Sequence, residues 1–142
     1  AAAAAAHYPL PCMTVDLGTA TTYNVISANR EFLGGFIVPG VQTSLRAISA
    51  GTAQLPPIAP EPPERLIGAN TVAALNNGAM FGTAAQLDGL ADRVEAELGQ
   101  PLTVVVTGGL APYITPCCKR KVIYDADLLF KGLALIWEKN HL

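Results

Sequence analysis

The N-terminal part of the chain alternates short β-favouring runs with turns. Valine, isoleucine, threonine and tyrosine recur in residues 13–15, 21–27 and 32–40 and favour extended backbone. The intervening residues 16–20 and 27–31 are mostly small or polar, as is typical of turns. Three consecutive strands with short connections predict an antiparallel meander.

Helical spacing replaces this pattern after Gly40. Val41, Leu45 and Ile48 recur at the spacing of one helix face. Residues 55–64 then hold five of the eleven prolines. Because proline lacks a backbone donor and fixes φ, this segment is expected to be an extended loop.

A second helical pattern starts at Asn70 and runs to Leu98, with apolar residues at helical spacing. Gly78 and Gly82 interrupt it. They predict either a break between two helices or a close crossing of two helices. The polar residues beside them argue against a membrane-dimer motif.

The C-terminal part adds strand–helix alternation. Residues 102–106 are a continuous apolar run, typical of a buried strand, and a glycine pair separates them from a short helix. Residues 122–124 predict another strand, followed by a helix from about Asp127 with Asp125 as its N-cap. The order β-β-β-α-α-α-β-α-β-α predicts an α/β fold, a mixed sheet with helices on both faces.

Length and charge narrow the choice of function. The chain has 142 residues, about one domain, and a net charge of −2. This charge argues against a nucleic-acid-binding surface, which would need a basic stripe. The one basic cluster, residues 119–121, is either a solvated loop or an anion contact. No apolar run is long enough to span a membrane.

The cysteines and the start of the chain bear on metal binding and on the cellular compartment. Three cysteines without C-x-x-C spacing, and two histidines at the chain ends, argue against a zinc site. An odd number of cysteines favours the reducing cytoplasm. The six initial alanines lack the features of a signal peptide. Residues 1–12 are therefore treated as an N-terminal remnant or placeholder segment, and the domain is expected in residues 13–142.

The first turn, DLGTATT from Asp16 to Thr22, carries candidate chemistry. A tight turn aims backbone N–H groups at one point, and Gly18 allows a ligand to approach closely. Such a turn binds phosphate, and its threonines add hydroxyl donors. Asp16 would repel phosphate unless a cation lies between them, since a carboxylate is a hard oxygen ligand. A hairpin whose aspartate caps its own turn is an equally good interpretation.

A second turn, Thr107-Gly108-Gly109, lies between a strand and a helix. The glycine pair admits a ligand close to the backbone, and the start of the following helix attracts anions. The spacing is not the G-x-G-x-x-G of dinucleotide-binding folds. Two such turns, far apart in sequence, predict a nucleotide held from two sides.

Several motifs in order resemble those of type III pantothenate kinases, within the actin/Hsp70/sugar-kinase superfamily. They are DLGTATTYNVI (16–26), FLGGFIVPG (32–40), TAQLP (52–56), IGANTVAALNNGAMFG (67–82), VVVTGGLAPYI (104–114) and LLFKGLALIWEKN (128–140). The resemblance runs from about Met13 to Asn140. It implies a ribonuclease H-like, actin-like ATPase domain, the C-terminal domain of a two-domain kinase.

Family members are about twice this length. By resemblance, their N-terminal half carries another phosphate loop and a G-x-D-R motif whose aspartate is the proposed base. Neither motif occurs here, and LADR, Leu90 to Arg93, lies inside an amphipathic helix. The resemblance therefore implies that no catalytic base lies in this chain and that the chain alone is inactive.

The resemblance also implies roles for individual residues. Asp16 would bind a monovalent cation, K⁺ or NH₄⁺, and Thr71 would contact pantothenate across a homodimer interface. The residues expected to bind ATP phosphates, with Mg²⁺ accompanying the nucleotide, are Gly18, Thr19, Thr21, Gly108 and Gly109. Thr71 is alternatively a helix cap, and Asn24 stands where the family usually has an aspartate.

The implied activity is ATP-dependent phosphorylation of pantothenate to 4′-phosphopantothenate, the first step of coenzyme A biosynthesis. This chain would supply the second half of the active site. Two alternatives remain open from the sequence. One is another kinase of the superfamily, acting on a sugar or small acid. The other is a non-enzymatic, nucleotide-binding regulatory protein.

Overall fold

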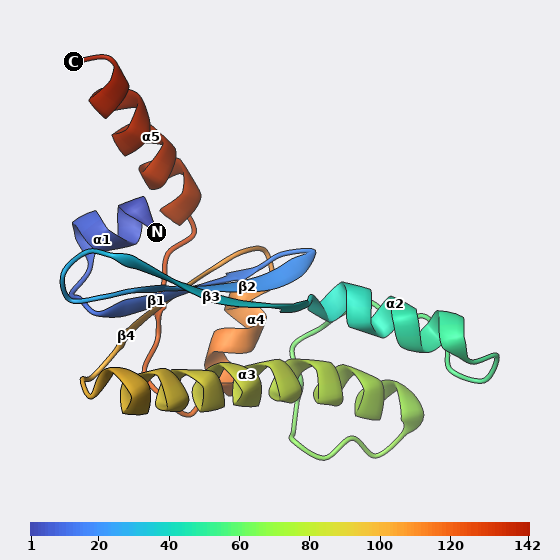
Figure 1. The fold of residues 1–142 in the computed structure, drawn as a ribbon. Coiled ribbons are helices and arrows are strands. Elements are labelled where there is room, and N and C mark those ends of the chain that lie inside the picture. Colours follow the sequence, from blue (N-terminus) through green and yellow to red (C-terminus); the bar gives the residue numbers. More distant parts are fainter.

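A five-stranded mixed sheet forms the centre of the protein, whose computed structural model describes residues 1–142 (Figure 1). The strands, in the sheet order β3-β2-β1-β4-β5, are β1 (Cys12–Leu17), β2 (Ala20–Ile26), β3 (Phe32–Pro39), β4 (Thr103–Thr107) and β5 (Ile123–Tyr124). β1, β2 and β3 pair antiparallel, whereas β4 joins β1, and β5 joins β4, in parallel. The predicted meander and mixed sheet are confirmed.

Helices cover both faces of the sheet, as predicted (Figure 1). α3 and α4 lie on one face, with α2 beside α3, and α1 and the start of α5 lie on the other. The helices are α1 (Ala2–His7), α2 (Val41–Gly51), α3 (Thr71–Leu98), α4 (Ala111–Ile114), the 3₁₀ helix η1 (Thr115–Cys117) and α5 (Leu128–Asn140). None of them is long and apolar enough to cross a membrane.

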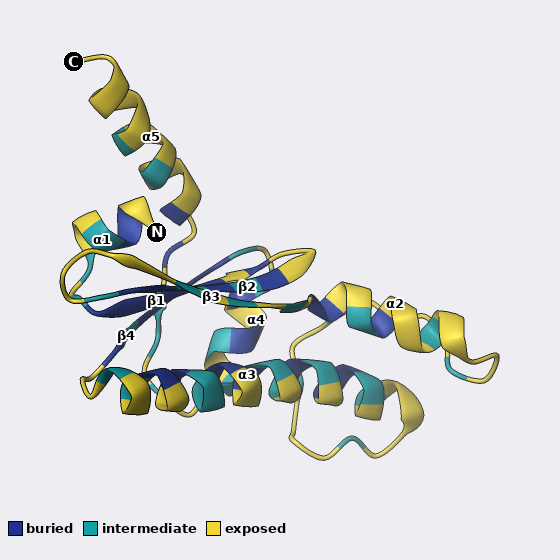
Figure 2. Ribbon diagram, viewed as in Figure 1, coloured by how far each residue is buried: buried dark blue, intermediate teal, exposed yellow.

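Alternation along the strands creates two cores. In β1, Met13, Val15 and Leu17 pack into the larger core between the sheet and α2, α3 and α4. Cys12 points to the opposite face and packs with Ala3 of α1 and with four further residues, Ala4, Ile26, Val105 and Leu128. Because successive side chains of a strand point to opposite faces, one strand contributes to both cores. Figure 2 shows this buried layer along the sheet.

Helix α3 is one continuous helix of 28 residues. The predicted break at Gly78 and Gly82 is therefore wrong, and so is the close crossing, because a Cβ at either glycine would meet nothing within 4 Å. A helical glycine costs about 1 kcal/mol relative to alanine. The buried stripe of α3, together with the Asn70 N-cap, offsets this cost; its apolar members are Met80, Ala84, Leu87, Ala91 and Val94.

The ends of two other elements differ from expectation. Only Gly18 and Thr19 separate β1 from β2, so Asp16 belongs to the strand and not to the turn. Helix α5 has Asp127 as its N-cap, and the prediction of Asp125 in that position is wrong. The Asp125 carboxylate instead accepts hydrogen bonds from the Asp127 N–H at 3.0 Å, from Lys131 and from Tyr8.

Residues 1–12 contribute to the structure. Ala2 to His7 form α1, whose Ala3 and Ala4 are buried. The Tyr8 hydroxyl donates a hydrogen bond to Asp125, just before α5. The alanine-rich start thus packs under the first turn of α5.

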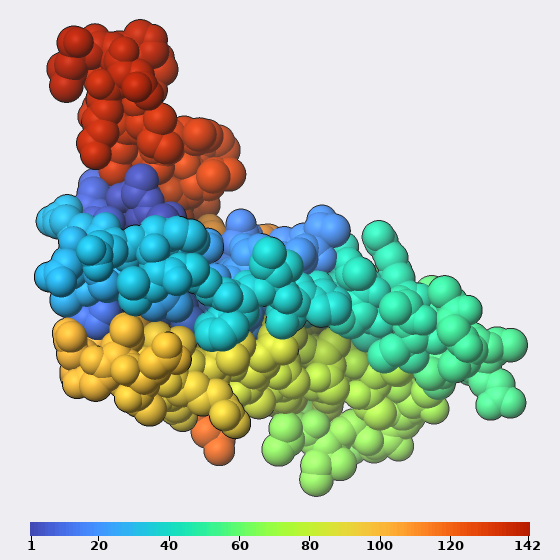
Figure 3. All heavy atoms as spheres, in the orientation of Figure 1, coloured from blue at the N-terminus to red at the C-terminus, as the bar shows by residue number.

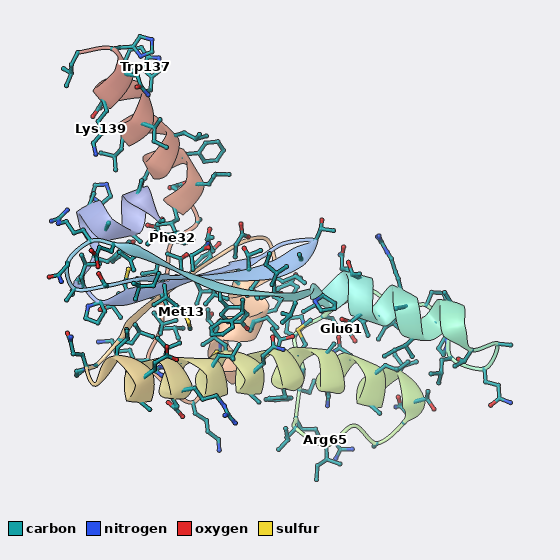
Figure 4. All side chains as sticks on the ribbon, viewed as in Figure 1. Met13, Phe32, Glu61, Arg65, Trp137 and Lys139 are labelled. Atoms are coloured by element: carbon teal, nitrogen blue, oxygen red, sulfur yellow. The ribbon has the colours of Figure 1, made fainter.

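The proline-rich loop between α2 and α3 is held by two buried asparagines of α3. Asn76 accepts a hydrogen bond from the Glu61 N–H at 3.0 Å and donates one to its carbonyl at 2.9 Å. Asn77 donates to the carbonyls of Arg65 and Leu66 at 2.6 and 3.1 Å. The loop is extended, as predicted, and Figure 4 shows Glu61 and Arg65 on it, near α3.

The basic cluster at residues 119–121 is not a simple solvated loop. The Arg120 side chain is only 18% exposed and forms ion pairs with Asp92 at 3.2 Å and Glu95 at 2.5 Å. Asp88 accepts hydrogen bonds from the backbone N–H groups of Lys119 and Arg120. These acidic residues of α3, which include Asp92 of the LADR segment, therefore hold the segment before β5 against α3.

Candidate phosphate-binding site

The two predicted turns meet at one edge of the sheet. β1 and β4 are parallel neighbours whose register places Asp16 beside Thr107, so their carboxyl ends lie together. A hollow of about 390 Å³ is lined by Leu17 at the end of β1, by Gly18 and Thr19 of the first turn and by Gly109 of the second. The two turns therefore lie next to each other and line the same hollow.

Gly108 allows the second turn to pack closely against the end of β1. Its φ of +103° is unfavourable for residues with a side chain, and a Cβ there would lie 2.7 Å from the Leu17 carbonyl oxygen. The second turn can therefore pass over the end of β1 only with glycine at this position. Gly108 contacts the protein backbone, while its neighbour Gly109 lines the hollow.

The helix after the second turn cannot attract anions as the sequence suggested. α4 has four residues and continues directly into the short 3₁₀ helix η1. A macrodipole needs aligned peptides over several turns, so this short helix gives little positive potential. Among the groups of this chain, a basic side chain is therefore the better source of positive charge for an anion.

Helix α2 supplies that side chain. Gln42, Thr43 and Arg46 line the same hollow as Gly18 and Thr19. Arg46 is exposed and forms no ion pair. A guanidinium with five N–H donors suits phosphate oxygens well.

Sequence reasoning missed these α2 residues. The sequence did contain information about them. Pro39-Gly40 indicates where the helix starts, and Gln42, Thr43 and Arg46, at positions i, i+1 and i+4, lie on one side of it. The sequence pattern did not show that this face turns towards the first glycine turn. That depends on how α2 leaves β3.

The start of α2 is fastened to the first turn. The Gly40 N–H and the Thr43 hydroxyl both donate to the Thr19 carbonyl oxygen, at 3.1 and 2.9 Å. A Cβ at Gly40 would lie 2.2 Å from that oxygen, so only glycine allows this approach. The turn backbone is thereby held in one position beside α2.

Asp16 faces a second hollow, of about 220 Å³, on the α1 and α5 side of the sheet. The polar residues around it are Thr14, Thr22, Asn24 and Thr107, and α5 closes part of its rim. Asp16 is the only acidic residue there, and an ideal Cβ at Gly18 would lie 3.5 Å from its Oδ1. The carboxylate therefore sits directly behind the first glycine turn.

Two predicted site residues lie apart from these hollows. Thr21 is 1% exposed and its side chain is on the core face of β2, away from the lining of the Gly18–Thr19 hollow. Thr71 is exposed at the start of α3. The side chain that caps α3 is Asn70, which accepts from the Ala73 N–H at 2.9 Å, so Thr71 is not the cap.

The cysteines show no sign of nucleophilic chemistry. Burial raises the pKa of Cys12 to about 11, and burial, with nearby Asp88, raises the pKa of Cys118 to about 12. A thiol is reactive as the thiolate, which these environments disfavour. No group of three or more His, Cys, Asp or Glu side chains comes together as a metal cluster.

Comparisons with known proteins agree with this geometry. The family model for type III pantothenate kinase matches residues 1–93. Type III pantothenate kinases of Hyphomonas neptunium and Dehalococcoides mccartyi (strain BAV1) are 41% and 43% identical over 94% and 99% of this chain. The chain spans about half the length of these relatives, 52% and 53%.

Solved structures show the same fold. A Campylobacter jejuni protein assigned to the Baf family of transcriptional activators has a TM-score of 0.64 and 27% identity, covering 96% of this chain and 62% of its own. The ethanolamine utilization protein EutJ of Carboxydothermus hydrogenoformans has a TM-score of 0.54 at 21% identity, covering 94% and 52%. This likeness shows that the domain shares the fold of these two proteins. Because the family model matches residues 1–93 and the relatives match nearly all of its residues, the chain belongs to the type III pantothenate kinase family.

Proposed function

We propose that this chain supplies the C-terminal half of a type III pantothenate kinase, which transfers the γ-phosphoryl group of ATP to the primary hydroxyl of pantothenate. One observation carries the proposal. In a chain of this family, the turns after β1 and β4 line one hollow together with the unpaired Arg46. Phosphoryl transfer depends mainly on positioning and charge neutralisation, which such a hollow can provide.

Within this proposal, Thr19, Gly18 and Gly109 bind the phosphates through backbone N–H groups and the Thr19 hydroxyl. Arg46 adds the positive charge that α4 is too short to give. Thr43 and Gly40 hold the Thr19 peptide in place. Gly108 and Thr21 do not contact the phosphates in this proposal. Gly108 lets the second turn pack on the backbone of β1, and the Thr21 side chain is buried in the core.

The residues behind the first turn fit a monovalent cation. Asp16 offers one carboxylate, and Thr22, Asn24 and Thr107 offer hydroxyl and amide oxygens in the same hollow. One negative charge among neutral oxygens suits K⁺ or NH₄⁺. When bound, this cation and the Mg²⁺ that accompanies ATP would neutralise phosphate charge.

The remaining roles lie partly outside this chain. We assign pantothenate contact to Thr71, acting across a homodimer interface, and the catalytic base to the N-terminal half of the enzyme. The 142-residue chain alone is then expected to be inactive. Its three free cysteines suit a cytoplasmic enzyme.

The test uses a completed polypeptide, in which this chain replaces the half of the Hyphomonas neptunium kinase that it matches. Transfer of labelled phosphate from ATP is measured with pantothenate, a sugar and a small hydroxy acid as acceptors, in K⁺ and in Na⁺. We expect pantothenate to be phosphorylated, and faster in K⁺.

Other outcomes would redirect the assignment. Transfer to a sugar or hydroxy acid but not to pantothenate would indicate another kinase of the superfamily. ATP binding without transfer to any acceptor would indicate a nucleotide-binding regulatory protein. Pantothenate phosphorylation by the 142-residue chain alone would contradict the missing base.

A further inference from the structure

Helix α5 carries an apolar face that nothing in the chain covers. It projects from the body of the protein (Figures 1 and 3), and Figure 2 shows it almost wholly exposed after its first turn. The exposed fractions are 65% for Leu129, 69% for Phe130, 55% for Leu133, 50% for Ile136 and 62% for Trp137. We call these five side chains the α5 stripe. In Figure 4, Trp137 lies at the far end of α5, away from the sheet.

The α5 stripe is separate from the face by which α5 holds the domain. Leu128 is buried in the smaller core, and a Cβ at Gly132 would lie 3.7 Å from Ala3 of α1. The stripe positions follow i, i+1, i+4, i+7 and i+8, which is one continuous face beside the docked face of α5. A single packed face is enough to dock a surface helix, so the second apolar face points to a partner.

A helix with such a face is not stable by itself in water. Isolated helices of this length are marginal, and tertiary packing usually provides their stability. An exposed, contiguous group of large apolar side chains marks an interaction surface. Two of the five are aromatic, the residue class that contributes most to binding energy.

The α5 stripe also borders the hollow that holds Asp16. Leu129, Leu133 and Ile136 line that hollow together with the polar residues of β1 and β2. A partner seated on α5 therefore also covers the Asp16 carboxylate. It needs apolar side chains against the helix and polar groups over the hollow.

A second copy of the chain does not meet this requirement. Its α5 would offer the same stripe but no polar group for Asp16. The family relatives, in contrast, contain about as much polypeptide again as this chain matches.

We infer that the α5 stripe and the adjoining Asp16 hollow form the docking surface for the half of the kinase that this chain does not match. The inference rests on the proposed function. It adds that α5 is the element that joins the two halves and that docking closes the proposed cation site. Docking would therefore stabilise α5 against local opening.

The test compares hydrogen exchange of α5 in this chain alone and in the completed polypeptide. We expect exchange of the amides from Phe130 to Trp137 to slow at least tenfold in the completed polypeptide. The two pieces co-expressed as separate chains provide the same comparison if the joined polypeptide does not fold.

Substitutions sharpen the comparison. Phe130→Glu with Trp137→Lys removes the aromatic anchors and introduces charges that suit the start and the end of a helix. This pair should reverse the tenfold slowing, with little effect on the chain alone. The control pair, Ile37→Glu with Ile67→Lys, changes two side chains that are 80% and 78% exposed on β3 and the proline-rich loop, and should leave the slowing intact.

Three outcomes would overturn the inference. They are equal exchange of α5 in both settings, slowing that survives the Phe130→Glu and Trp137→Lys pair, and slowing in the chain alone that grows with its concentration, which indicates a second copy. Pantothenate phosphorylation is measured separately. Slow α5 exchange without phosphorylation supports docking and contradicts the proposed function, whereas phosphorylation with unprotected α5 does the reverse.

Discussion

The Thr43 hydroxyl of α2 donates a 2.9 Å hydrogen bond to the Thr19 carbonyl oxygen in the β1–β2 turn. Thr43 thereby joins the helix that carries Arg46 to the turn that carries the candidate phosphate contacts. The Gly40 N–H shares the same acceptor. This relationship ties the two sides of the hollow together before any ligand is present.

Replacing Thr43 with valine should loosen the turn without changing the fold, because valine has a similar shape. Losing one hydrogen bond of about 0.5–1.5 kcal/mol should raise the KM for ATP in the completed polypeptide about two- to tenfold. Thr43→Ser, which keeps the hydroxyl, should restore the KM. An unchanged KM in Thr43→Val would show that Gly40 alone holds the turn.

Arg46→Ala should weaken nucleotide binding. A hydrogen bond to a charged group contributes about 1.5–3 kcal/mol, so the Kd of ATP measured by calorimetry should rise about ten- to hundredfold. Arg93→Ala, an exposed arginine of α3 outside the hollow, removes the same charge and should have little effect. Equal weakening in both variants would indicate a general charge effect and remove Arg46 from the site.

Asp16→Asn should reduce the K⁺ dependence and the ATP use of the completed polypeptide together. The variant keeps the side-chain shape but loses the charge that a cation needs, and the expected loss in rate or affinity is about ten- to hundredfold. Glu31→Gln, an exposed acid after β2, serves as the control. A K⁺ titration curve identical to that of the unsubstituted enzyme would count against the cation role of Asp16.

Asn77→Ala should release part of the proline-rich loop. Asn77 donates to the Arg65 carbonyl at 2.6 Å, and the lost hydrogen bonds should favour local opening by about 1–3 kcal/mol. Trypsin should then cleave after Arg65 about five- to hundredfold faster while the protein remains folded. The control is Asn29→Ala in the exposed β2–β3 turn, which should leave the cleavage rate unchanged. An unchanged cleavage rate in Asn77→Ala would show that other contacts hold the loop.

Stability should fall in acid because of Asp125. Burial raises the pKa of this carboxyl, but hydrogen bonds from Lys131, Tyr8 and the Asp127 N–H outweigh burial and hold the pKa below its ordinary value. The resulting stabilisation is complete above the unfolded-state pKa of about 3.9 and is lost as pH falls through the lower folded-state value.

The test is the free energy of unfolding in urea, measured for Asp125→Asn and for the unsubstituted chain at several pH values from 2.5 to 7. The variant should be less stable than the unsubstituted chain at neutral pH and should approach it below about pH 4. A constant difference in unfolding free energy across that range would mean that the Asp125 charge does not contribute.

Much of the sheet could be predicted because its strands follow local rules. The alternation in β2 and the apolar run of β4 predict their strands, and Gly18 and Gly109 were found as residues that line the hollow. The continuous helix through Gly78 could not be predicted, because its stability comes from packing against the sheet and not from local propensity.

The missed parts of the site depend on tertiary geometry. Arg46 is an ordinary exposed residue of an amphipathic helix until α2 is placed beside the β1–β2 turn. The anion role expected of α4 was overestimated, because the short helix that the sequence predicts has only four residues before it continues into η1. Thr21 was grouped with Thr19 because both follow Gly18, yet strand alternation turns its side chain into the core.

The parallel pairing of β1 with β4 has a consequence for synthesis on the ribosome. The β1–β3 meander emerges early and can pair within itself, whereas β4 emerges only after α2, the proline-rich loop and α3. Until β4 arrives, one edge of β1 is unpaired and open to wrong partners. During that time the hollow beside the first turn lacks its Gly109 and Leu110 side, so the proposed phosphate contacts are incomplete in a nascent chain. If the proposed site is correct, all of its phosphate contacts are in place only after β4 has paired with β1.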